Sequence, residues 1–279
     1  MLAVIDFIKK WGVIMLKHVV AAIQMNCALG NKEGNLQKAK TLIEQALEQH
    51  ATFIVLPELF NTGYRVEEQD WQYAETIPGE TTSYLQRIAT QHDITIIGCI
   101  LERGEIEGMI FDTAFVIAKN GILGKYRKTH LWDQENLRFT RGDTLSVIQK
   151  GDLKMGLQIC YEIGFPEGAR LLTLQGANLL IYPSAFSEKR YYVWDTASKA
   201  RAIENGCFVI AANRSGIEKQ STNFGGKSRI IDPQGNVLIE ATKEDECIVA
   251  TIDIQRVIQQ RRDVPYLRDL NKVLFYPSL

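Results

Sequence analysis

Residues 154–182 read KMGLQICYEIGFPEGARLLTLQGANLLIY, and this stretch decides the fold class. It begins with a short apolar run at 154–159, which predicts a buried strand. Residues 166–175 follow with helical spacing of their apolar side chains, and Pro166 suits the first position of a helix. A second apolar run at 178–182 predicts another strand. The order strand, helix, strand is typical of an α/β protein.

The same alternation extends over the rest of the chain. We predict further strands at 18–25, 52–56, 94–101, 110–118, 207–212, 227–231 and 247–252, and further helices at 35–49, 82–92 and 191–204. The turn residues Asn120-Gly121 follow one of these strands and predict a hairpin. Because hairpins pair antiparallel strands, we expect a mixed sheet with helices on at least one face. No linker or internal repeat divides the chain, which indicates one domain.

The composition excludes several classes of protein. Of 279 residues 46% are hydrophobic and 23% are charged, which is enough apolar material for a sizeable core. The 32 basic and 33 acidic residues leave a net charge of −1, so nothing electrostatic favours nucleic acid or an anionic membrane as a partner. The five cysteines form no CxxC pair, which argues against a disulfide framework or a zinc site. We therefore expect a reducing, cytoplasmic compartment and no metal.

The first residues of the chain are apolar, but they do not predict a membrane helix. Residues 1–14 contain Asp6, Lys9 and Lys10, and no run approaches the ~18 apolar residues that a membrane helix requires. The segment also lacks the order of regions found in a signal peptide. We expect a short N-terminal extension there.

Cys160 is the residue with the clearest chemical signal. It ends a predicted strand and stands shortly before the helix that begins near Pro166. A thiol near a helix N-terminus is expected to favour the thiolate, and a turn at a sheet edge is where substrates of α/β proteins bind. Both features predict a nucleophile. The alternative is a buried structural cysteine.

Two further ionisable groups stand in unusual places. Glu58 directly follows the apolar run 52–56, where poor solvation would raise the pKa of its carboxyl towards that of a useful general base. Lys128 lies in GKYRKTHLW, for which a solvated basic cluster is the alternative. His130 in the same segment is the histidine that could serve Cys160, but the surroundings of the cysteine lack the pattern of papain-like proteases.

Together these segments resemble the nitrilase superfamily of carbon–nitrogen hydrolases. The resemblance runs from about Met15 to the C-terminus and rests on LPELFNTGY at 56–64, GKYRKTHLW at 124–132 and the stretch around Cys160. The later stretches RAIENGCFVIAANRSG and GGKSRIIDPQGNVL also resemble that family. The resemblance implies a four-layer α-β-β-α sandwich with two mixed β-sheets, formed by residues 15–279, and no cofactor.

The resemblance also implies a role for individual residues. Glu58 would be the general base that deprotonates Cys160, whose sulfur would attack the amide carbon. Lys128 would stabilise the oxyanion together with the backbone N–H of Tyr161. Ammonia or an amine would leave, and a water activated by Glu58 would hydrolyse the thioester. Glu135 matches a second glutamate that positions the substrate in many members.

Four aromatic residues near these motifs are candidates for substrate binding: Tyr64, Trp132, Tyr161 and Phe186. Trp194 is a fifth aromatic residue that could line the pocket. For each of them the alternative is packing in the core or at an interface.

The residues after the cysteine bear on the substrate. Superfamily branches that hydrolyse N-carbamoyl amino acids often place an arginine where this chain has Ile163-Gly164, because arginine binds the substrate carboxylate. Nitrilases proper tend to have Trp-Glu, whereas this chain has Tyr161-Glu162. The resemblance therefore favours a small amide or carbamoyl substrate without an α-carboxylate. A nitrilase and a catalytically silent binding or scaffold protein are the alternatives.

The last part of the chain resembles the C-terminal arm of the family, which reaches across a dimer interface. The arm begins at about residue 255 and carries Leu274, Phe275 and Tyr276 near its end. Such an apolar tail would otherwise be exposed to water. We therefore expect a homodimer or a higher homo-oligomer.

Overall fold

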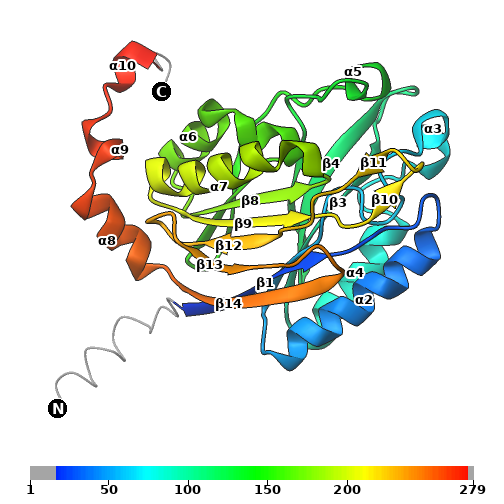
Figure 1. Cartoon of the computed structure of the whole chain (residues 1–279), viewed down its shortest axis with the longest axis horizontal. Helices are drawn as coiled ribbons and strands as arrows, with labels where there is room; N and C mark the ends of the chain where they lie inside the picture. Colours follow the sequence, from blue (N-terminus) through cyan, green and yellow to red (C-terminus); the bar gives the residue numbers. More distant parts are fainter. Residues whose placement is uncertain (1–16, 276–279) are drawn as a thin grey trace.

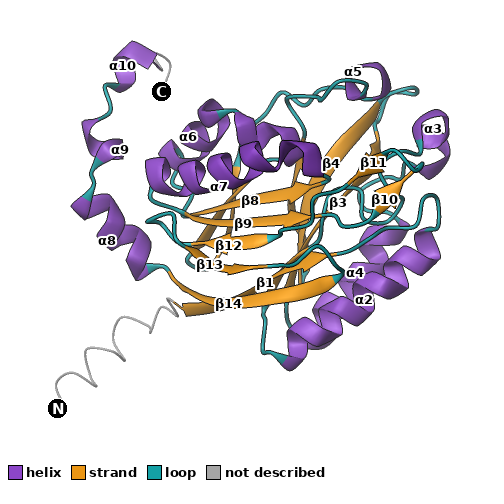
Figure 2. Cartoon of the chain, viewed as in Figure 1, coloured by secondary structure: helices purple, strands orange, loops and turns teal. Residues whose placement is uncertain are grey.

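The computed structural model of the chain describes residues 17–275, so the expected extension at 1–14 and Tyr276 lie outside the described residues. Two six-stranded sheets face each other in the middle of the molecule (Figure 1). Helices α2 (Lys32–Glu48) and α4 (Glu80–His92) cover the outer face of one sheet. Helices α6 (Pro166–Leu174) and α7 (Tyr191–Asn205) cover the outer face of the other (Figure 2). This is the expected α-β-β-α sandwich.

The first sheet has the strand order β14-β1-β2-β3-β4-β5. Its strands are β1 (Lys17–Gln24), β2 (Phe53–Val55), β3 (Thr95–Arg103), β4 (Ile110–Ala118), β5 (Gly121–Arg127) and β14 (Glu246–Asp253). Strands β1, β2 and β3 are parallel, and the other pairs are antiparallel. The hairpin predicted at Asn120-Gly121 joins β4 to β5 and is confirmed.

The second sheet has the order β13-β12-β9-β8-β7-β6. Its strands are β6 (Val147–Lys150), β7 (Leu153–Leu157), β8 (Leu179–Ser184), β9 (Phe208–Asn213), β12 (Arg229–Ile231) and β13 (Val237–Glu240). The central strands β7, β8 and β9 are parallel, and the outer pairs are antiparallel. Both sheets are thus mixed, as predicted, although the sequence analysis did not find β6 or β13.

The inner strands of the first sheet, β1 to β4, bury both of their faces over most of their length. In β1, Val20 and Ala22 pack in the core between the two sheets, whereas Ala21 and Ile23 pack in the core under α2 and α4. Successive side chains of a strand point to opposite faces, so a strand covered on both sides is apolar at every position. This explains why the predicted strands appear in the sequence as uninterrupted apolar runs.

Short elements gather at one end of the two sheets. They are η1 (Glu67–Gln69), α3 (Asp70–Tyr73), α5 (Glu135–Arg138), η2 (Cys160–Gly164), η3 (Glu188–Arg190) and the hairpin of β10 (Ile217–Glu218) and β11 (Thr222–Asn223). All the residues singled out for chemistry lie in or beside this group.

The C-terminal arm leaves the sandwich after β14. It consists of α8 (Gln255–Asp263), α9 (Tyr266–Asp269) and α10 (Lys272–Phe275), and Figure 1 shows α9 and α10 standing away from the sheets. Val273 and Leu274 in α10 are 80% and 69% exposed. Within residues 17–275 there is no helix with the length and apolar character needed to cross a membrane.

Candidate active site

Cys160 lies in a turn with a left-handed backbone conformation. It is the first residue of η2, just after β7, and its φ is 47°. A residue with a side chain adopts this conformation at a cost of about 1–3 kcal/mol, and such strain clusters at functional sites. The side chain lies in the wall of a cavity of about 350 Å³. The turn therefore presents the sulfur to any molecule that fills the cavity.

The thiol of Cys160 is not activated by a helix N-terminus. Helix α6 begins only at Pro166, six positions further along the chain. Burial, followed by the charge of Glu58, raises the pKa of the Cys160 thiol well above its usual range, although Lys128 opposes this. The expectation that the helix favours the thiolate is therefore wrong. A neutral thiol needs a base beside it.

Glu58 is the candidate for such a base. It follows β2, is completely buried, and accepts the backbone N–H of Ala185 at 2.7 Å on Oε2. Its Oε1 accepts from Lys128 Nζ at 2.6 Å. Burial raises the pKa of the Glu58 carboxyl to about 8, with a further rise from Asp112 and an opposing effect of Lys128. The carboxyl can therefore both accept and return a proton near neutral pH.

Lys128 is buried, unlike its basic neighbours. Lys125 and Arg127 on β5 both bind Glu102, at 2.5 and 2.8 Å, and are partly exposed. Lys128 follows them at the end of the strand and is 0% exposed. For Lys128, the alternative of a solvated basic cluster is wrong.

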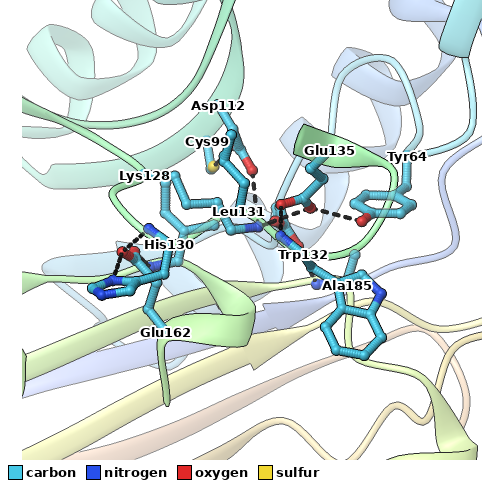
Figure 3. Close-up of polar contacts among 12 residues, drawn as sticks. Tyr64, Cys99, Asp112, Lys128, His130, Leu131, Trp132, Glu135, Glu162 and Ala185 are labelled. Atoms are coloured by element: carbon cyan, nitrogen blue, oxygen red, sulfur yellow. Dashed lines mark hydrogen bonds and ion pairs between the residues drawn. The ribbon is translucent and has the colours of Figure 1, made fainter. Parts of the chain in front are cut away.

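The ammonium of Lys128 is surrounded by three carboxylates, of which Figure 3 labels those of Asp112 and Glu135. Its Nζ donates to Glu58 Oε1 at 2.6 Å, Glu135 Oε1 at 2.9 Å and Asp112 Oδ2 at 3.3 Å. Burial alone would lower the pKa of Lys128, but these three carboxylates raise it well above its usual range. The residue is therefore a permanent cation inside the protein.

Glu135 joins this ion cluster to the cavity. It is the first residue of α5, and its Oε2 accepts the backbone N–H of Trp132 at 2.7 Å. The hydroxyl of Tyr64 donates to Oε1 at 2.6 Å, the same oxygen that Lys128 binds. Because Tyr64 lines the cavity, Glu135 connects a residue that faces the cavity to the buried cation.

Asp112 is the member of the cluster that the sequence analysis missed. It lies on β4, is completely buried, and its Oδ1 accepts from the thiol of Cys99 at 3.0 Å. The one available signal was a single acid inside the apolar run IFDTAFVIA. Carboxylate oxygens of Glu58, Asp112 and Glu135 lie within 4.8 Å of one another, close enough to hold a metal ion. Lys128 donates to all three, so an ammonium already occupies the position among them that a metal ion would take.

Glu162 is a second buried carboxylate that the sequence analysis did not assign to the site. Its Oε1 accepts the backbone N–H groups of Thr129 at 2.9 Å and His130 at 3.0 Å, and its Oε2 accepts that of Ile159 at 2.8 Å. Burial raises the pKa of this carboxyl, but hydrogen bonds from the side chains of His130, Thr129 and Tyr126 and from the N–H of Ile159 outweigh it and lower the pKa overall. The ionised carboxylate of Glu162 therefore connects the segment after Lys128 to the turn that contains Cys160.

His130 is part of this connection through Glu162 and does not line the cavity. Its Nδ1 lies 2.9 Å from Thr129 Oγ1, and its ring stacks on Phe165 with 4.2 Å between centroids. The residues that line the cavity include Cys160 but not His130. Within residues 17–275, His130 is therefore not paired with Cys160.

The four aromatic candidates lie together at the cavity. Tyr64, Trp132, Tyr161 and Phe186 all line it, and the rings of Trp132 and Tyr161 meet at 4.8 Å. Trp194 lies behind them in the core, where its Nε1 donates to a backbone carbonyl at 2.8 Å. The aromatic residues therefore form an apolar wall beside the cysteine.

The cavity also has basic walls. Arg65, Arg138, Lys189 and Arg190 line it. Two of these charges are neutralised, because Arg65 pairs with Glu67 and Arg138 with Asp70. The guanidinium of Arg190 lies 4.4 Å from the ring centre of Trp132, and within residues 17–275 neither Lys189 nor Arg190 forms an ion pair. The cavity therefore has positive charge available for an anionic group.

Comparisons with known proteins show which family the chain matches. Residues 19–262 match the family model described as Carbon-nitrogen hydrolase. The chain is 37% identical to a nitrilase of Pyrococcus abyssi, over 91% of this chain and 95% of that protein. It is 33% identical to the 2-oxoglutaramate amidase of Bacillus subtilis, over 93% and 100% of the two chains. The crystal structure of Saccharomyces cerevisiae Nit3, a member of branch 10 of the nitrilase superfamily, superposes with a TM-score of 0.85 at 30% identity, covering 92% and 98%.

Proposed function

The chain belongs to the carbon–nitrogen hydrolase family, and from this premise we propose that it hydrolyses the carbon–nitrogen bond of a small amide through a thioester on Cys160. One observation carries the proposal. The strained turn holds the cysteine in the wall of a cavity, and the charges of Glu58, Lys128 and Glu135 all act on its sulfur. A nucleophile, a base and a cation are thus brought together in a place without bulk water.

The reaction begins when the amide carbonyl lies against the sulfur. Glu58 takes the thiol proton as the sulfur bonds to the carbonyl carbon, and Lys128 with the backbone N–H of Tyr161 binds the resulting oxyanion. Glu58 then gives its proton to the departing nitrogen, and ammonia or an amine leaves. A water molecule passes a proton to Glu58 as it attacks the thioester, and the proton returns to Cys160 as the acid departs. Glu135 holds Tyr64 and Lys128 in place throughout.

We propose that the acyl part of the substrate carries an anionic group remote from the amide. The unpaired Lys189 and Arg190 of the cavity wall support this, because a carboxylate there would gain charge-assisted hydrogen bonds. The similarity to a 2-oxoglutaramate amidase supports it as well, since such a substrate has a carboxylate at the end opposite the amide. A carboxylate on the leaving amine is not expected, because Ile163 and Gly164 offer it no charge.

Ammonia release by the wild type and by Cys160→Ala tests the proposal. The substrates are neutral amides, ω-amides of dicarboxylic acids, carbamoyl amines, N-carbamoyl amino acids and matched nitriles. We expect activity on the amides, and its loss in a variant that keeps the melting temperature of the wild type. Activity on nitriles alone would show that the protein is a nitrilase. The similarity to the nitrilase of Pyrococcus abyssi supports this alternative. Absence of turnover on every substrate would favour a binding protein.

We further propose that residues 15–279 act as one domain that assembles as a homodimer or higher homo-oligomer. The exposed apolar side chains of α10, Val273, Leu274 and Phe275, support this, because an isolated chain would leave them in water. The chain contains only free cysteines, which supports a reducing cytoplasmic compartment. Sedimentation at micromolar concentration tests the assembly, and a monomer would contradict it.

A further inference from the structure

Lys128 has no free hydrogen-bond donor in this structure. A lysine ammonium has three N–H groups, and here Glu58, Glu135 and Asp112 accept all three. A cation that stabilises an oxyanion must turn one N–H towards it. The contact with Asp112 is the longest of the three at 3.3 Å, against 2.6 and 2.9 Å, so it is the one most easily exchanged.

The charges of the cluster do not balance if every group is ionised. One ammonium faces three carboxylates in a place where none of the four side chains is more than 1% exposed. Two unbalanced negative charges without water are costly, so such clusters retain a proton. Burial raises the pKa of Asp112 as it does that of Glu58, although Lys128 opposes this in both. These two carboxyls are therefore the ones between which the proton is shared.

We propose that Asp112 is a positioning residue of this site, which acts through Lys128 and Glu58. Its carboxylate is the exchangeable third acceptor of the ammonium, and its negative charge keeps a proton on Glu58 until substrate fills the cavity. The inference rests on the proposed function, since it assigns Asp112 to the same reaction. Asp112 acts only through these neighbours, because its two oxygens already accept from Lys128 and Cys99, so the proposal gives it no contact with substrate or with the reacting atoms.

The groups that face Glu58 come from six segments, and Asp112 is distinct among them. They are Cys99 on β3, Asp112 on β4, Lys128 after β5, Glu135 on α5, Cys160 on η2 and Tyr64 after β2. Glu135 is already bound by Tyr64 and by the N–H of Trp132. Asp112 accepts from Lys128 and from the weak thiol donor of Cys99, and it shares a hydrogen bond with Glu58, so its charge acts directly on the Glu58 carboxyl.

The variant Asp112→Asn removes this charge and keeps the shape of the side chain and one acceptor oxygen. We would measure kcat/KM for the best amide between pH 5 and 9. Removing a neighbouring negative charge makes Glu58 easier to ionise, so the midpoint of the ascending limb should move to lower pH, by about 1 pH unit. At pH 6 the ratio of kcat/KM to its plateau should rise by roughly 3–10-fold.

Cys99→Ser is the matched control. It changes the same neighbourhood, keeps a donor for Asp112 Oδ1 and removes no charge. Its ascending limb should stay at the position of the wild type. An unchanged limb in Asp112→Asn, or an equal movement in Cys99→Ser, would overturn the inference. Asp112→Ser serves in place of the asparagine variant if that protein does not fold.

A second measurement separates this inference from the proposed function. Alkylation of Cys160 by iodoacetamide, followed on its peptide by mass spectrometry, needs no substrate. The thiolate forms when its proton has an acceptor, so the alkylation rate at pH 6–7 should rise several-fold in Asp112→Asn and not in Cys99→Ser. If the wild type hydrolyses no amide, this profile still tests Asp112, and an unchanged rate contradicts the role given to it.

Discussion

Replacing Glu58 by glutamine separates the chemistry of this residue from its effect on stability. Glutamine has the shape of the protonated carboxyl but cannot accept a proton. If Glu58 is the general base, the variant should lose about 10²–10⁴-fold in kcat. The same substitution should also change how the stability of the protein depends on pH.

The magnitude follows from the pKa of Glu58, which burial raises from 4.5 to about 8. Below pH 4.5 the group is protonated in both the folded and the unfolded chain. Between pH 4.5 and 8 the unfolded chain loses this proton and the folded chain retains it, so the wild type loses free energy of unfolding as the pH rises. The full difference corresponds to at most about 5 kcal/mol. Because the protonation of Glu58 is coupled to Asp112 and Lys128, we expect the wild type to lose about 1–3 kcal/mol of unfolding free energy over this pH range.

The glutamine variant cannot ionise at this position, so its unfolding free energy does not fall with pH in this way. Its one side-chain oxygen cannot accept from both Ala185 and Lys128, which adds a cost of about 1–3 kcal/mol that does not depend on pH. The informative quantity is therefore the difference in unfolding free energy between variant and wild type, measured by urea denaturation at pH 5 and pH 8.5. This difference should favour the variant more at pH 8.5.

Two results would refute this reasoning. Turnover near the wild-type rate in Glu58→Gln would remove the residue from the role of base. A difference in stability that is the same at both pH values would show that the Glu58 carboxyl is not held protonated by burial. Glu102→Gln is the control, because hydrogen bonds from Arg127 and Lys125 lower the pKa of Glu102 against the effect of burial. Glu102 is therefore ionised in both the folded and the unfolded chain above about pH 5, and its stability difference should be the same at both pH values.

Three further predictions concern the cation, the cavity and the arm. Lys128→Ala should lower kcat by about 10²-fold or more, since it removes an oxyanion contact. Steady-state kinetics at saturating amide measure this, and a smaller loss of kcat would contradict the role given to Lys128. Arg190→Ala should raise KM for amides that carry a carboxylate by about 10-fold and leave KM for neutral amides within about 2-fold; equal effects on both would mean that the arginine only packs on Trp132. Deletion of residues 265–279 should convert the oligomer to a monomer in sedimentation experiments, and an unchanged sedimentation coefficient would contradict an interface formed by the arm.

The sandwich could be predicted largely from local patterns. Strands such as β8 and β9 are buried on both faces, so they appear in the sequence as apolar runs. Helix α6 is indicated by Pro166 at its first position and by the helical spacing of its apolar residues. The edge strands β6 and β13 were missed, because they are only partly buried and their composition is mixed. The resemblance, and not the periodicity, supplied the second sheet.

The sequence by itself determined which side chains are suited to chemistry, because a cysteine after a strand and a glutamate after an apolar run are visible one segment at a time. Only the tertiary structure decided their charge states. The cluster of Glu58, Asp112, Lys128 and Glu135 joins segments up to 77 positions apart, from residue 58 to residue 135, so no local pattern contains it. The neutral state of the Cys160 thiol likewise follows from burial and from Glu58, not from the helix that comes next in the chain. Desolvation and charge pairing depend on what surrounds a group in three dimensions, and the order of residues does not specify this.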